Sequence, residues 1–201
     1  ADVVHKFWRK ACEVLSDEPT MNGVLTRGIS AKPDIAGLRE RFNLKAAAIA
    51  TYPMYRGLAS LVGMDLLDTG TSVEDEFQTY LDRYDDYTYF FIHIKGTDEA
   101  GEDGAFDRKV QRIEEFDAAL PVLMRKKPEV LSITGDHSTP CFMELHSWHP
   151  VPLMILSPRC GGDSKPRFTE EECNSGLGIF ESRHLMNLLL ANAAKLDKYG
   201  A

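Results

Sequence analysis

Two polar segments in the second half of the chain contain histidine, and in one of them an aspartate is adjacent to it. Asp136 and His137 are adjacent in the segment TGDHSTP, which comes directly after the apolar run 130–133. His146 lies in the turn-rich segment HSWHPVP, which leads into a second apolar run, 153–156. Carboxylates supply negative charge and histidine supplies a neutral nitrogen donor, a combination that suits a divalent metal ion acting on phosphate.

A third group of acidic residues lies upstream. The apolar run 89–94 ends in KGTDEAGEDG, which contains Asp98 and Glu102. Three strands are therefore expected to deliver Asp, Glu or His at their carboxyl ends, where open α/β sheets place their sites. Because Asp98 and Glu102 are four residues apart, one helical turn would put them on the same side. The three groups together predict a metal site for phosphate chemistry.

The adjacent residues Asp136 and His137 bear on the number of ions. Their side chains point in different directions if the backbone is extended, so they could serve two neighbouring ions, as in two-metal phosphoryl-transfer sites. Each candidate also has a structural alternative. Asp136 could be a turn aspartate beside a helix cap, Asp98 a helix N-terminal aspartate, Glu102 a surface glutamate, and His146 a structural histidine.

Composition narrows the class of protein. The 201 residues are 43% hydrophobic and 27% charged, which is typical of a globular protein, and the net charge of −8 with no basic stripe argues against nucleic-acid binding. No apolar run approaches the roughly 20 residues that span a bilayer. The first residues lack the pattern of a secretion signal. The four cysteines show no CxxC pair, so we expect reduced thiols in a cytoplasmic protein.

Helical and strand patterns alternate along most of the chain, which predicts an α/β fold. Strands are expected over 23–27, 46–51, 65–67, 89–94, 130–133 and 153–156. Helices are expected over 3–15, 33–42, 53–62, a stretch capped by Ser72, 106–125 and 182–196, with a loop over 158–178. The turn-rich stretch near residues 68–76 suggests a boundary between a smaller α/β lobe, 1–72, and a larger one, 73–201. A single continuous domain fits nearly as well.

Several motifs resemble one family. The segments RGIS, KAAAIATYPMYRGLASLVGMD, FFIHIKGTDEAGEDG, ITGDHSTPC, HSWHPVPLMI and LGIFESRHLM are similar to those of cofactor-independent phosphoglycerate mutases of the archaeal type, in the alkaline-phosphatase superfamily. The resemblance runs from about Val24 to Met186. It implies a three-layer α/β fold, a mixed sheet flanked by helices, with part of an inserted smaller domain in residues 1–72. It also implies two divalent ions, Mn²⁺ first and Mg²⁺, Zn²⁺ or Co²⁺ as alternatives, and no 2,3-bisphosphoglycerate.

The resemblance also assigns residues. It implies that Asp98, Glu102 and His146 hold one ion, and that Asp136 and His137 hold the other. The family commonly has histidine where this chain has Glu102, and a carboxylate there shifts the preference toward harder ions.

Arginine is the residue through which the resemblance implies substrate binding. Arg27 matches a position near the substrate carboxylate or phosphate, a task that suits its planar guanidinium. Arg56 is a second substrate-binding candidate, although an exposed helix arginine explains it equally well.

The resemblance predicts interconversion of 3- and 2-phosphoglycerate through a phosphoserine. The family's nucleophilic serine and N-terminal aspartate motif have no match here, so we expect a C-terminal fragment with no catalytic nucleophile and little activity alone. A phosphohydrolase, phosphopentomutase or phosphonate-cleaving enzyme of the same superfamily is an alternative, as is a non-catalytic α/β interaction module. The expected partner is the small phosphoglycerate, with no nucleic acid and no membrane. Self-association through exposed sheet edges is a further expectation.

Overall fold

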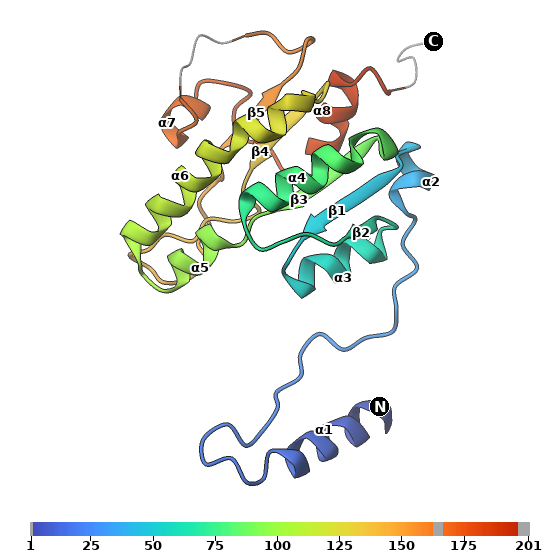
Figure 1. The fold of residues 1–201 in the computed structure, drawn as a ribbon, viewed down its shortest axis with the longest axis vertical. Coiled ribbons are helices and arrows are strands. Elements are labelled where there is room, and N and C mark those ends of the chain that lie inside the picture. Colours follow the sequence, from blue (N-terminus) through green and yellow to red (C-terminus); the bar gives the residue numbers. More distant parts are fainter. Residues whose placement is uncertain (1, 163–166, 197–201) are drawn as a thin grey trace. The chain divides into compact units, whose positions relative to one another are not determined.

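The computed structural model describes residues 2–162 and 167–196, and their contacts divide the chain into two compact units that meet between Ile35 and Ala36. The first unit contains helix α1 (Asp2–Val14), followed by a long segment without regular structure (Figure 1). The Trp8 indole N–H donates to the Val24 carbonyl at 3.1 Å, which ties this segment to α1. The predicted helix at 3–15 is confirmed. The predicted strand at 23–27 is wrong, because this segment pairs with no other strand among the described residues.

A parallel sheet forms the centre of the second unit. Its strands are β1 (Ala46–Ala50), β2 (Asp65–Leu67) and β3 (Tyr89–His93), in the order β2-β1-β3. Ala46 pairs with Tyr89 and Ala50 with His93, so β1 and β3 are in register along their whole length. Every residue of β1 is buried, which requires cover on both faces of the sheet.

Helices supply that cover. Helix α3 (Pro53–Leu61) connects β1 to β2 and packs against both, while α4 (Val73–Arg83) connects β2 to β3. Helix α4 packs against α6 (Phe106–Leu123), and both contribute to the hydrophobic core. The buried members of this core are Ala47, Ile49, Leu67, Phe77, Tyr80, Leu81, Ala119 and Leu123.

The last two strands form a separate antiparallel pair. Strand β4 (Leu131–Thr134) pairs with β5 (Leu153–Leu156), with Thr134 opposite Leu153. The loop between them carries Asp136, His137 and His146. Because β5 runs antiparallel to β4, the amino end of β5 meets the carboxyl end of β4. His146 precedes β5 in the chain, so it lies at the amino end of this strand, and the expectation that all three strands deliver their residues at carboxyl ends is wrong for β5.

Most predicted elements are present, with shifted ends. The helix expected at 33–42 is α2 (Leu38–Phe42), which begins only after the extended residue Gly37. The capping box at Ser72 is confirmed, since its hydroxyl accepts from the Asp75 amide at 3.1 Å. The remaining segments are α5 (Gly96–Glu102), α7 (Glu170–Cys173), α8 (Leu185–Asn192) and the 3-10 turns Tyr84–Asp86, Met124–Lys126 and Ser182–His184. Helix α7 interrupts the loop predicted over 158–178, of which residues 163–166 lie outside the described range.

The strands on either side of the expected boundary at residue 72 belong to one sheet. Strands β1 and β2 precede that residue, β3 follows it, and β1 pairs with both. By their contacts, the first compact unit ends at Ile35 and the second begins at Ala36. The assignment of residues 1–72 to an inserted domain stays a prediction.

Candidate metal centre

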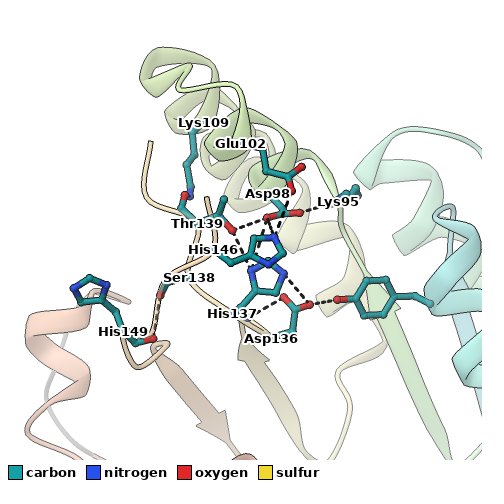
Figure 2. Close-up of polar contacts among 11 residues, drawn as sticks. Lys95, Asp98, Glu102, Lys109, Asp136, His137, Ser138, Thr139, His146 and His149 are labelled. Atoms are coloured by element: carbon teal, nitrogen blue, oxygen red, sulfur yellow. Dashed lines mark hydrogen bonds and ion pairs between the residues drawn. The ribbon is translucent and has the colours of Figure 1, made fainter. Parts of the chain in front are cut away.

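Helix α5 begins directly after β3 and carries the first two candidate ligands. Asp98 lies in its first turn and Glu102 at its last position, so the predicted helical spacing is confirmed. The Asp98 side chain is mostly buried, at 16% exposed, whereas Glu102 is 46% exposed. Both project toward the loop that follows β4 (Figure 2).

Asp98 is held by two donors. Lys95 forms an ion pair with its Oδ2, and the Thr139 hydroxyl donates to its Oδ1 at 2.5 Å. Burial acts to raise the pKa of Asp98, but the hydrogen bonds from Lys95 and Thr139 outweigh burial and leave this pKa below its ordinary value. Asp98 is therefore a fixed, ionised carboxylate.

Two histidines stack beside this carboxylate. The rings of His137 and His146 lie 3.7 Å apart between centroids and 28° from parallel. Asp98, His137 and His146 each offer one ligand atom, and these three atoms lie within 4.8 Å of one another. Figure 2 shows Glu102 and Asp136 at opposite ends of the same cluster. All five predicted ligands thus come together, from α5 and from the β4–β5 loop.

The Nε2 nitrogens of the two histidines face different carboxylates. His146 Nε2 lies 3.6 Å from Asp98 Oδ1 and 3.4 Å from Glu102 Oε1, while His137 Nε2 lies 3.5 Å from Asp136 Oδ2. Thr139 gives its single hydroxyl proton to Asp98, so its oxygen accepts from His137 Nδ1 at 3.0 Å. This assigns the proton of a neutral His137 to Nδ1 and leaves the Nε2 lone pair facing Asp136.

Asp136 and His137 do not point apart as an extended backbone would require. Both residues lie in a bend, and the His137 amide donates to Asp136 Oδ1 at 3.1 Å. The bend brings the two side chains to the same side, so that one ion could bind both.

Three groups that support the site were not predicted from the sequence. The Tyr55 hydroxyl, from α3, donates to Asp136 Oδ2. Thr139 is 4% exposed and contacts both Asp98 and His137, and Lys109 donates to the Thr139 carbonyl at 2.5 Å. Thr139 belongs to the TGDHSTP segment and could have been noticed there. Nothing in the sequence marks Tyr55, because its partner lies 81 residues away.

Helix α5 packs closely against the loop between β4 and β5. A methyl group at Gly101 would lie 2.3 Å from the Thr139 carbonyl oxygen, too close for any side chain. Glycine at this position therefore allows the loop that carries His137 to approach the helix that carries Asp98.

The two predicted substrate arginines differ in their surroundings. Arg27 is exposed in the first unit and precedes Gly28, whose φ is +69°. Arg56 donates to the carbonyls of Ala50 and Leu67 at 3.1 and 3.3 Å, and to Asp68 at 3.1 Å. These contacts hold the carboxyl ends of β1 and β2 together. Substrate binding by either arginine stays a prediction.

Two further histidines lie near the cluster. His149 stacks on Trp148, and its Nδ1 lies 2.8 Å from the Ser147 hydroxyl. His93, at the end of β3, stacks on Tyr55, and burial together with the charge of Lys95 lowers its pKa. The imidazole that stacks on Tyr55 is therefore uncharged.

The fold and this cluster define an α/β metalloenzyme. The family profile described as the Metalloenzyme superfamily matches residues 16–192, and the chain belongs to that superfamily.

The chain is similar to curated proteins named "Probable 2,3-bisphosphoglycerate-independent phosphoglycerate mutase". It is 54% identical over 203 residues to that of Aquifex aeolicus (strain VF5) and 48% identical over 202 residues to that of Thermotoga maritima. In both comparisons the match covers 100% of this chain and 50% of the relative. The chain therefore spans about half the length of the curated relatives it matches.

Two solved structures have a similar fold. A protein from Pyrococcus horikoshii matches with a TM-score of 0.86 and 28% identity, over 100% of this chain and 58% of that one. The cofactor-independent phosphoglycerate mutase of Thermoplasma acidophilum matches with a TM-score of 0.66 and 23% identity, over 94% of this chain and 51% of that one. The predicted α/β fold of the alkaline-phosphatase type is confirmed. Among the described residues, no helix has the length and apolar character needed to cross a membrane.

Proposed function

We propose that this chain carries the metal-binding residues of a cofactor-independent phosphoglycerate mutase, which interconverts 3- and 2-phosphoglycerate through a phosphoserine. The observation that carries the proposal is the grouping of Asp98, His137 and His146, whose ligand atoms lie within 4.8 Å of one another. The names of the relatives support the same activity. The substrate is a small molecule, and the expected location is the cytoplasm.

Two divalent ions fit the donors present. Asp98, Glu102 and His146 would hold one ion, since His146 Nε2 faces both carboxylates at 3.6 and 3.4 Å. Asp136 and His137 would contribute to the second, since the free nitrogen of His137 faces Asp136. Oxygen and imidazole donors suit Mn²⁺, and the three carboxylates also suit Mg²⁺.

When bound, such ions stabilise the negative charge that develops on a phosphoryl group during transfer. The chain's own residues would do the positioning. Lys95 and Thr139 hold Asp98 in one orientation, and Thr139 fixes the protonated nitrogen of His137. Arg27 would orient the glycerate carboxylate or phosphate, with Arg56 as the second candidate. The serine nucleophile would come from a segment outside these 201 residues.

Calorimetric titration with Mn²⁺ tests the metal site. We expect Asp98→Ala and His146→Ala to abolish tight binding, because each removes a ligand of the first ion. His184→Ala is the matched histidine control, since His184 is exposed and contacts Arg183 rather than the cluster. Absence of Mn²⁺ binding by the unaltered protein, or equal binding by all variants, would contradict the proposed site.

The reaction itself is tested with the full-length protein. Turnover of 3-phosphoglycerate to 2-phosphoglycerate without added 2,3-bisphosphoglycerate is the expected result. Release of free phosphate without isomerisation would instead identify a phosphohydrolase with the same metal site.

A further inference from the structure

The candidate metal centre is divided between two sheets. Asp98 follows β3 of the parallel sheet, whereas Asp136 and His137 follow β4 of the antiparallel pair. Among the described residues, backbone pairing joins β3 to β1 and β4 to β5. Side-chain contacts must therefore fix the position of the β4–β5 loop against the parallel sheet. The Thr139–Asp98 hydrogen bond is one such contact, and Tyr55 provides another.

Tyr55 is firmly attached to the parallel sheet. Its ring stacks on that of His93 at 3.8 Å between centroids and 22° from parallel, and on Phe91 at 6.3 Å and 28°. The next residue of α3, Arg56, is bonded to the carbonyls of Ala50 and Leu67. Contacts with α3 and β3 thus fix the position of Tyr55 independently of its hydrogen bond to the loop.

Asp136 needs such an anchor. Its side chain is 47% exposed, and the His137 amide holds only one of its carboxylate oxygens, Oδ1, at 3.1 Å. The Tyr55 hydroxyl donates to Oδ2, the same oxygen that His137 Nε2 faces at 3.5 Å. A carboxylate oxygen has two lone pairs, so this donor leaves room for a second partner on Oδ2.

We propose that Tyr55 is a positioning residue of the metal centre, which orients Asp136 toward the ion that it shares with His137. The inference rests on the proposed metal site. Groups that hydrogen-bond a metal ligand typically change metal affinity by about 10- to 100-fold when they are removed. The role needs the hydroxyl, because the ring alone can stack on His93 without restraining Asp136.

Calorimetric titration with Mn²⁺ separates these roles. Tyr55→Phe keeps the ring stack and removes the hydroxyl, and we expect it to weaken Mn²⁺ binding by about 10-fold. The matched control is Tyr52→Phe, since Tyr52 precedes α3, lies 6.1 Å from the Tyr55 ring and contacts Lys95 through its ring face. This control should bind as the unaltered protein does.

A double-mutant cycle shows whether Tyr55 acts through Asp136. In an Asp136→Ala background, Tyr55→Phe should change the remaining Mn²⁺ affinity by less than about twofold, because the acceptor of the Tyr55 hydroxyl is already absent. Equal weakening in both backgrounds would overturn the inference, as would unaltered affinity of Tyr55→Phe alone; the proposed metal site would survive either result. Failure of the unaltered protein to bind Mn²⁺ would refute the metal site and the role of Tyr55 together.

Discussion

Gly101 is the position where a single methyl group tests the assembly of the metal centre most directly. The residue is buried in α5, and an added Cβ would lie 2.3 Å from the Thr139 carbonyl oxygen, 3.0 Å from Thr139 Cγ2 and 3.1 Å from Lys109 Nζ. The nearest atom belongs to the backbone and cannot rotate away. Gly101→Ala must therefore displace the loop from the helix.

Competing effects determine how far Gly101→Ala changes the free energy of unfolding. Replacing glycine by alanine within a helix stabilises it by about 1 kcal/mol. Overpacking costs about 1–3 kcal/mol, and loss of the charged Lys109–Thr139 hydrogen bond costs a further ~1.5–3 kcal/mol. The costs exceed the gain, so Gly101→Ala should lower the free energy of unfolding by about 1.5–5 kcal/mol.

Gly57→Ala is the matched control, because Gly57 lies inside α3 and an added Cβ meets no atom within 4 Å. It should stabilise the protein by up to about 1 kcal/mol. Urea unfolding measures both variants, and a change in midpoint with an unaltered m-value identifies a change in stability. If Gly101→Ala is as stable as Gly57→Ala, the tight contact between α5 and the β4–β5 loop does not exist.

Two further predictions concern acidic side chains. Burial, with the charge of Asp75, raises the pKa of Glu76 from 4.5 to about 7, and its Oε2 has no hydrogen-bond partner in the part of the chain that the structure describes. The folded protein then holds this proton more tightly than the unfolded chain, so stability falls as pH rises from 4.5 to about 7, by up to about 1.4 kcal/mol per pH unit. Glu76→Gln should stabilise the protein more at pH 8 than at pH 5 in urea unfolding, and an equal effect at both pH values would contradict the raised pKa. Glu102→His removes a charge and adds a softer donor, so it should shift the preference from Mn²⁺ toward Zn²⁺ in competitive titration. Glu99→His is the control and should leave the preference unchanged.

The apolar runs of the sequence predicted most of the fold. Strands such as β2 and β5 match their predicted residues, because a short apolar run between turn residues has few alternatives in an α/β chain. The prediction of a strand at 23–27 is wrong, since its composition suits a strand but no strand within 2–162 or 167–196 pairs with it. A mixed sheet was predicted, but not which strand runs antiparallel, because an apolar run has the same appearance in either direction.

The candidate ligands were recognisable because their chemistry is local. Asp98 and Glu102 share one helical turn, and Asp136 and His137 are neighbours in one loop, so residue type and spacing were enough to select them. The sequence also determined that the site contains three carboxylates and two imidazoles, which decides the kind of ion that it suits.

Tertiary structure decided how these groups face one another. The bend at Asp136 turned two side chains expected to diverge toward a common point, and Thr139 determined which nitrogen of His137 is free. Tyr55 contacts Asp136 only because α3, which carries Tyr55, packs on the parallel sheet. Such contacts join residues 41 to 81 positions apart, and only the packing of two sheets around one loop brings them within hydrogen-bonding distance.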